Sequence, residues 1–243
     1  MRVFESKEKA IVYAYTMTDD TGFAPCINNK ILSLACCKTN LRYKIARDIN
    51  SGNENIYLLG LCGKQMADRH KYISEYLPIY LAKITKSVTT EEYFGGEDFI
   101  SRPDAKYLFD GQKWYVKSGN PHVPINTNKS ELSNPEKNKD LYYFYRNSNK
   151  PKLNSVLISE NFAYFGKHFN EPRDLPEVLK KICEIRKESV RGDLKPIYIT
   201  TEEDKRDLLS FLNTNSCFNV QNESNTIDTY FVKKKCHKEN KCR

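Results

Sequence analysis

The chain has 243 residues, of which 29% are charged and 12% aromatic, a composition typical of soluble globular proteins. Its length allows one large domain or two small ones, and no apolar run approaches the roughly 18 residues that a membrane-spanning helix needs. The first ten residues lack the apolar stretch of a secretory signal, so we expect a cytoplasmic (intracellular) protein with mostly reduced cysteines and no membrane partner.

The net charge of +8 is unevenly distributed along the chain. The last eleven residues, 233–243, contain six Lys or Arg and one Glu, so they contribute +5 and leave +3 for the rest. A basic tail attracts phosphate backbones without reading their sequence. A solvated terminus without a partner explains the same composition, and both interpretations stay open.

The predicted elements of the first half are mostly strands. Residues 11–18, 30–37 and 56–62 are rich in β-branched, aromatic and other apolar side chains, which favours strands. Residues 41–48 are compatible with a short basic helix. Residues 78–88 alternate imperfectly between apolar and polar side chains and predict one long, bulged strand.

Two local signals mark the connections that follow. Thr89 and Glu92 have the spacing of a capping box and predict the start of a short helix. The pair Asp110-Gly111 lies between two aromatic runs and predicts a β-hairpin. Residues 118–140 are rich in Asn, Ser, Pro and Lys and predict a long loop, which in a compact domain is a lid, a binding loop or a disordered segment.

The pattern changes after residue 170, from strands to alternating helices and strands. Two more strands come before the change, at 141–146 and 155–159. The elements expected after it are, in order, helix 174–190, strand 196–200, helix 202–212 and strand 226–232. Helix 174–190 has one apolar face, formed by Leu175, Val178, Leu179, Ile182 and Ile185.

This order of elements predicts an α+β fold in three parts. A strand-rich main domain spans residues 8–168, an αβαβ segment spans 170–232, and the basic tail spans 233–243.

The eight cysteines do not have the spacing of a zinc site. Structural zinc sites use two clusters of closely spaced ligands, whereas Cys36 and Cys37 are adjacent and the tail holds a single Cys/His cluster. We therefore name no metal ligands, and the sequence leaves both the cofactor and the metal requirement undetermined. Cys37 or Cys62 acting as a nucleophile beside a histidine is the alternative to simple core packing.

Two lysines follow apolar strands directly. Lys38 comes after strand 30–37, and Lys64 comes after strand 56–62 and Gly63. Binding residues concentrate in the loops at strand ends. If the two strands are neighbours, both ammonium groups lie at one rim that suits a phosphate or a nucleotide, and Arg42 extends the positive patch. Two solvated lysines are the alternative.

Three further residues are candidates for chemistry or stacking. Asp20, in the turn sequence DDTGFAP, is placed to serve as an acid/base group or to form a salt bridge. His122 lies in the predicted long loop and is a second acid/base candidate. Trp114, the only tryptophan, stands on the second arm of the predicted hairpin, where it either stacks on a nucleobase or packs in the core.

Five stretches occur together and in order: TMTDDTGFAPCINNKILSLACCKTNLR, IYLLGLCGK, PIYLAKITKSVTTEEYF, SRP and VLISENFAYFG. Over about residues 11–168 they resemble the nucleotide modification associated domain 2 family, which occurs in bacteria and phages and is linked to DNA base modification mainly by genomic association. The positions that carry the resemblance are Asp20, Gly22, Phe23, Ala24, Pro25, Cys37, Lys38, Gly60 and Lys64. The chain departs from the family pattern at Thr21 and at Leu61-Cys62-Gly63.

The resemblance implies a subject, nucleotides or nucleic acid, without a reaction. The strand order is also compatible with a barrel-like domain of the PUA, EVE or ASCH type, small β-barrels that read modified bases. That likeness is an analogy of fold and carries little weight for function.

Three functional hypotheses follow. In the first, the protein binds a nucleotide or a modified base in nucleic acid through Lys38, Lys64 and Arg102, with Trp114 stacking on the base. In the third, it is an interaction protein whose basic tail is the only contact with nucleic acid.

The second hypothesis is an enzyme that acts on a nucleotide or nucleobase. Asp20 and His122 are then the acid/base candidates, Lys38 stabilises charge, and Cys37 is the candidate nucleophile. The sequence leaves the choice between binder and enzyme open and indicates no oligomeric state.

Overall fold

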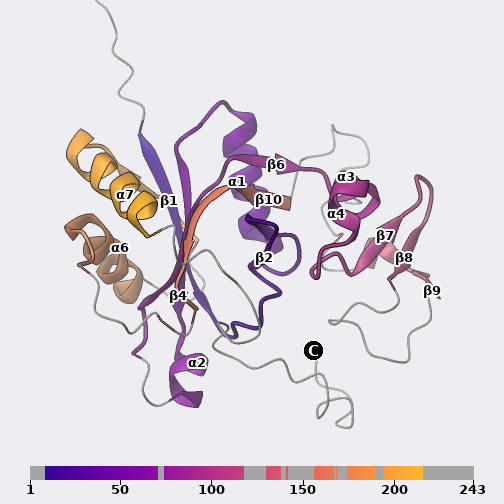
Figure 1. Ribbon diagram of the computed structural model, residues 1–243, viewed down its shortest axis with the longest axis horizontal. Helices are drawn as coiled ribbons and strands as arrows, with labels where there is room; N and C mark the ends of the chain where they lie inside the picture. Colours follow the sequence, from indigo (N-terminus) through magenta and orange to yellow (C-terminus); the bar gives the residue numbers. More distant parts are fainter. Residues whose placement is uncertain are drawn as a thin grey trace, which may run out of the picture.

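The computed structural model describes residues 9–70, 74–117, 130–137, 141, 156–166, 168, 174–189 and 194–215. Its described part is a mixed α+β structure with three sheets, flanked by helices (Figure 1). Several predicted features lie outside the described residues: most of the strand 141–146, the strand 226–232, His122 and the basic tail.

The largest sheet has five strands in the order β11-β5-β4-β1-β12. Its strands are β1 (Ala10–Met17), β4 (Ile56–Cys62), β5 (Pro78–Lys83), β11 (Asn161–Tyr164) and β12 (Ile197–Ile199). Only β1 and β4 pair in parallel, with Met17 opposite Cys62, and the other pairs in this sheet are antiparallel. Parallel neighbours require a crossover connection, which here includes helix α1 (Thr39–Asn50).

The five-stranded sheet is covered on both faces. Helices α6 (Glu177–Glu188) and α7 (Glu202–Thr214) lie on one side of it, and α1 and the second sheet lie on the other (Figure 1). Because both faces of the sheet are covered, β4 is buried at every position, and its sequence is an unbroken apolar run. Strand β12 pairs with β1, so the described part of the αβαβ segment is built into the same core.

The second sheet has the order β2-β3-β10-β6. Its strands are β2 (Cys26–Asn28), β3 (Ile31–Leu34), β6 (Lys86–Val88) and β10 (Val156–Ser159). The predicted strand 78–88 is divided between the two large sheets, because the Ile84 amide donates to Ile56 in the first and the Thr85 amide donates to Ile158 in the second. None of the described sheets closes into a barrel, so the barrel-like architecture is not confirmed.

A smaller sheet lies on the side of the molecule away from α6 and α7 (Figure 1). It contains β7 (Tyr107–Phe109), β8 (Trp114–Val116) and β9 (Ser130–Glu131), and it adjoins α3 (Thr90–Gly95) and α4 (Glu97–Ile100). The predicted hairpin at Asp110-Gly111 is confirmed, because β7 and β8 pair around it. The predicted capping box is also confirmed, with Thr89 Oγ1 accepting from the Glu92 amide and Glu92 accepting from the Thr89 amide.

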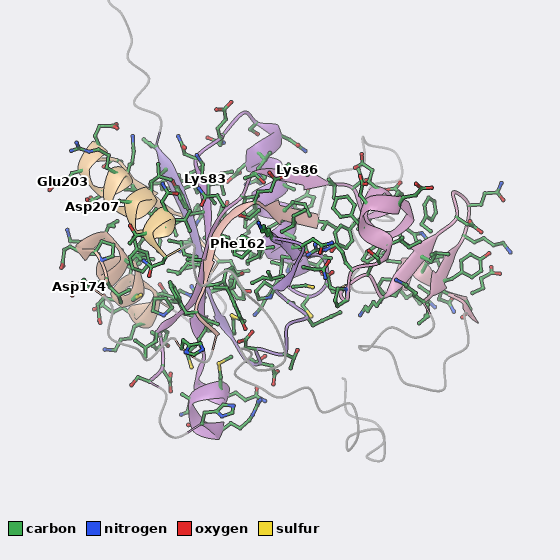
Figure 2. The ribbon with its side chains drawn as sticks, viewed as in Figure 1. Lys83, Lys86, Phe162, Asp174, Glu203 and Asp207 are labelled. Carbon is green, nitrogen blue, oxygen red and sulfur yellow. The ribbon has the colours of Figure 1, made fainter. Side chains whose placement is uncertain are left out.

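The helical layer differs from its prediction in one important position. Val178, Leu179 and Ile182 are buried as expected, but Ile185 is exposed and Arg186 is buried in its place. Residue 186 lies four positions after Ile182, so it continues the buried face of α6. Figure 2 shows that Glu203 and Asp207 of α7 lie on the outer surface, whereas Phe162 of β11 lies among the packed side chains of the core.

Candidate functional site at the ends of two parallel strands

Strands β1 and β4 end at the same edge of the five-stranded sheet. The Gly63 amide donates to the Met17 carbonyl over 3.0 Å and joins the two strand ends. A β carbon at Gly63 would stand 2.5 Å from that carbonyl oxygen, so this close approach requires glycine. In α/β sheets, ligands bind outside the carboxyl ends of parallel strands, so we expect a ligand site at this edge.

A cavity of about 170 Å³ opens at this edge. We call it the strand-end cavity. Its lining comes from three regions of the chain: the end of β1, the start of α2 (Lys64–Arg69) with the segment before β5, and the end of α6. The side chains that matter for its chemistry are those of Thr16, Lys64, Gln65, Glu75, Tyr76, Arg186 and Ser189.

Lys38 approaches the same strand end from another side. Its Nζ donates to the Thr16 carbonyl over 3.3 Å and lies 4.9 Å from the centre of the Tyr15 ring. The sequence predicted that Lys38 and Lys64 lie at one rim if their two strands are neighbours. In fact β3 and β4 belong to different sheets. The two lysines are instead both close to Thr16: Lys38 donates to its carbonyl, and Lys64 lines the cavity together with it.

An unusual backbone turn presents Lys38. Cys37 and Lys38 are both left-handed, with φ of 60° and 47°, a conformation that costs non-glycine residues about 1–3 kcal/mol each. Arg42 holds this turn, since its Nε donates to the Cys37 carbonyl over 2.8 Å and its amide donates to the Lys38 carbonyl. Arg42 is fully buried, so in this structure its side chain lies under the turn instead of on the surface.

The electrostatic surroundings of Lys38 favour an anion. Partial burial lowers the pKa of Lys38, Cys37 raises it, and the positive charge of Arg186 lowers it further. Arg186 therefore lies close enough for its charge to act on Lys38. Two like charges held near one another at a cavity are both stabilised when an anion binds between them.

A row of tyrosines crosses the sheet next to this site. The strand registers place Tyr15, Gly60, Tyr80 and Tyr164 side by side on β1, β4, β5 and β11. The hydroxyls of Tyr15 and Tyr80 are 2.9 Å apart, and the Tyr164 hydroxyl donates to Oδ2 of Asp20 over 2.7 Å. We call these three tyrosines and Asp20 the tyrosine–aspartate cluster.

The cluster is buried, and this burial keeps the phenols of Tyr15 and Tyr80 protonated. Burial raises the pKa of Tyr80 well above its usual value, and the charges of Tyr15 and Asp20 raise it further. Burial also raises the pKa of Tyr15, on which the charges of both Cys37 and Asp20 act. Asp20 itself is 1% exposed, so it lies behind the surface and not on the cavity wall.

Two of the predicted binding residues lie elsewhere, Arg102 against strands β2 and β3 of the second sheet and Trp114 on β8 of the smaller sheet. Arg102 is 3% exposed and donates to the Tyr93 hydroxyl over 2.9 Å and to Ser33 Oγ over 2.8 Å, and it also donates to backbone carbonyls near β2 and β3. Trp114 is 2% exposed and packs against the rings of Phe94 and Phe109. The structure does not bring either residue to the strand-end cavity.

Of the remaining candidates, Cys37 is exposed next to Lys38, and His122 lies outside the described residues. Sequence reasoning missed Arg186, Tyr76 and the tyrosine row. The signal for Arg186 was its spacing of four from Ile182 on the buried face of α6. The tyrosine row depends on strand order, which no local pattern contains.

Metal and membrane features were searched over the same part of the chain. Among the described residues, no three His, Cys, Asp or Glu side chains gather as a metal site would require. No helix in that part combines the length and apolar character needed to cross a membrane. Its cysteines carry free thiols, at positions Cys26, Cys36, Cys37, Cys62 and Cys183.

Comparison with known proteins assigns the chain to a family. The family model described as nucleotide modification associated domain 2 matches residues 9–215. The match therefore includes α6, β12 and α7, and extends beyond the stretch 11–168 in which the sequence motifs lie. No curated protein and no solved structure matches the chain.

Proposed function

Because the chain belongs to the nucleotide modification associated domain 2 family, we propose that it binds a nucleotide, free or as part of a nucleic acid, at the strand-end cavity. One observation carries the proposal: Lys38, Lys64 and Arg186 come from three separate segments and meet around the end of β1. Cationic side chains of this kind are the usual ligands of phosphate groups.

The position of Arg186 supports a binding role for it. The residue is 8% exposed and lines the cavity, where its guanidinium contributes a permanent positive charge. Its charge also lowers the pKa of Lys38, so Arg186 in the cavity lining and Lys38 beside the end of β1 repel one another. A phosphate would relieve that repulsion. Arg186 thus takes the role that the sequence analysis gave to Arg102.

An enzyme acting on a nucleotide or nucleobase is the second candidate. The observation in its favour is that the charges of Asp20 and Cys37 both act on Tyr15, so an acidic group and a thiol lie near one phenol and near Lys38. Asp20 would need to reach the ligand from a buried position, where it accepts a hydrogen bond from Tyr164. Binding therefore has the stronger support.

The test is a fluorescence-anisotropy titration of the full chain with labelled single-stranded DNA and RNA, with and without modified bases, at two salt concentrations. Lys38→Gln, Lys64→Gln and Arg186→Gln should each weaken binding about tenfold, the value of one charge-assisted hydrogen bond. The matched control is Lys180→Gln, an exposed residue of α6 that pairs only at the surface with Glu177. Equal affinity in all four variants would contradict the proposal.

The alternatives give different results in the same assay. If the basic tail 233–243 is the only contact with nucleic acid, its removal abolishes binding and the cavity variants behave like wild type. If the protein is an enzyme, incubation with its nucleotide yields a product detectable by mass spectrometry, and Asp20→Asn loses turnover but keeps binding.

A further inference from the structure

We propose that the base of the bound nucleotide stacks on the ring of Tyr76, next to β5. The phosphate then lies on the other side of β4, next to β1. This inference rests on the proposed nucleotide function and assigns an orientation and a specificity residue to the same cavity. The sequence predicted Trp114 as the residue that stacks on a base, but the Trp114 ring is buried against the rings of Phe94 and Phe109. Tyr76 is the aromatic side chain in the cavity lining.

Two backbone hydrogen bonds fix Tyr76 at the edge of the sheet. The Tyr76 amide donates to the Cys62 carbonyl over 2.8 Å, and the Cys62 amide donates to the Leu77 carbonyl over 2.8 Å. The register between β4 and β5 shifts next to this point, between Gly60 and Leu61. Tyr76 is therefore held beside the carboxyl end of β4, at the same sheet edge as the cavity.

The backbone of Tyr76 is strained. Its φ is 67°, in the left-handed region, which is a true outlier for a bulky aromatic residue. Such conformations cost about 1–3 kcal/mol and concentrate at ligand sites, where surrounding contacts enforce them. The ring is half-buried, since part of it packs against the main core while the residue also lines the cavity.

The strand order separates the aromatic from the cations. Tyr76 precedes β5, Lys64 follows β4, and Lys38 donates to the end of β1. Neighbouring strands lie about 4.8 Å apart, so the β5 side and the β1 side of the cavity are separated by roughly 10 Å. That separation suits a nucleotide lying across the end of β4, with its base at Tyr76 and its phosphate near Lys38 and Arg186.

The charge of Glu75 supports the same orientation. Glu75 lines the cavity next to Tyr76, and a carboxylate repels phosphate and can only accept hydrogen bonds from a ligand. The amino groups of adenine, cytosine and guanine are suitable donors to it. The cavity of about 170 Å³ is smaller than the sites of drug-sized ligands, so it has no room for more than one nucleotide unit.

The experiment compares a ligand that has a base with one that lacks it. The full chain is titrated calorimetrically with deoxycytidine monophosphate and with deoxyribose 5-phosphate. Tyr76→Leu keeps an apolar side chain but removes the aromatic face, and it should weaken binding of the nucleotide about tenfold, the value of one base–aromatic stack. Its binding of deoxyribose 5-phosphate should be unchanged. Tyr76→Phe keeps the aromatic face and should bind both ligands like wild type.

Arg186→Gln provides the matched comparison, because it should weaken both ligands equally. Melting temperatures of all variants show whether a loss of binding reflects a loss of folding, and Tyr76→Phe keeps the assay informative if the leucine variant is unstable. A Tyr76→Leu variant that binds the nucleotide like wild type, or that loses both ligands alike, overturns the role of Tyr76 alone. A wild-type protein that binds neither ligand overturns this inference, whereas the proposed function is overturned only if the anisotropy titration with DNA and RNA also shows no binding at the cavity.

Discussion

The ring of Tyr80 occupies the space directly over Gly60, so that a β carbon added to Gly60 would stand 2.2 Å from Cε1 of the tyrosine. This glycine is what allows Tyr80 on β5 to reach across β4 and place its hydroxyl 2.9 Å from that of Tyr15 on β1. A glycine inside a strand often marks such a close approach. The glycine in the apolar run LLGLC therefore has a specific structural purpose.

The first prediction is that Gly60→Ala destabilises the fold by about 1–3 kcal/mol, because the new methyl group displaces the Tyr80 ring from a closely packed core. Chemical denaturation measures this loss of free energy of unfolding. The control is a double-mutant cycle with Tyr80→Ala, which removes the ring that the methyl group meets. In that background the alanine should cost much less, and additive effects would show that the two residues do not compete for space.

The second prediction concerns the hydrogen bond from Tyr164 to the buried Asp20. Tyr164→Phe removes a donor to a carboxylate that is 1% exposed, and it should cost about 1–3 kcal/mol of stability. Tyr198→Phe is the matched control, because Tyr198 is exposed on β12 and its hydroxyl should contribute close to nothing. Thermal unfolding of both variants tests this, and equal stability would show that the Tyr164 hydroxyl does not stabilise Asp20.

The third prediction compares two arginines that each face an aspartate. Arg102 and Asp104 are buried 3.6 Å apart, whereas Arg69 and Asp19 form an exposed pair at 2.8 Å. Arg102→Ala should cost about 3–5 kcal/mol at neutral pH, because it leaves Asp104 as a buried charge, whereas Arg69→Ala should cost less than about 1 kcal/mol. Urea unfolding of both variants measures the difference, and similar costs would contradict the importance of burial.

The same variant carries a pH dependence with a definite sign. Burial raises the pKa of Asp104 above its usual value, and Arg102 opposes that rise. Without Arg102 the pKa of Asp104 rises further, so the folded variant binds a proton that the unfolded chain releases. The stability lost through Arg102→Ala should therefore shrink as pH falls below the raised pKa of Asp104. A cost that stays constant between about pH 7 and pH 4 would exclude a charged Asp104 as its cause.

Local signals predicted the local features of this fold well. The capping box of Thr89 and Glu92 and the hairpin at Asp110-Gly111 were confirmed because both depend on residues next to one another in the chain. Helix α7 begins with a similar cap, since Thr201 Oγ1 accepts a hydrogen bond from the Asp204 amide.

The site was harder to predict because it depends on strand order. Lys38 and Lys64 were identified from their positions after strands, yet they are related through Thr16 of β1 and not through neighbouring strands of their own. Trp114 looked suited to stacking because it stands on a hairpin, and only the tertiary packing of Phe94 against it shows that it is buried. Tyr76 had no sequence signal, because its role depends on a left-handed backbone beside a register shift.

The last prediction concerns the pH dependence of phosphate binding. Partial burial and the charge of Arg186 lower the pKa of Lys38, so its ammonium loses its proton at a lower pH than an exposed lysine. Affinity for inorganic phosphate, which is a dianion throughout this range, should therefore fall as pH rises from about 8.5 to 10.5. In Arg186→Gln the overall affinity is weaker, but the midpoint of this fall should move to higher pH, because one cause of the lowered pKa is removed. Calorimetric titration at several pH values measures both effects, with Lys180→Gln as the control that keeps the wild-type midpoint. An unchanged pH profile in Lys38→Gln would show that another group controls binding.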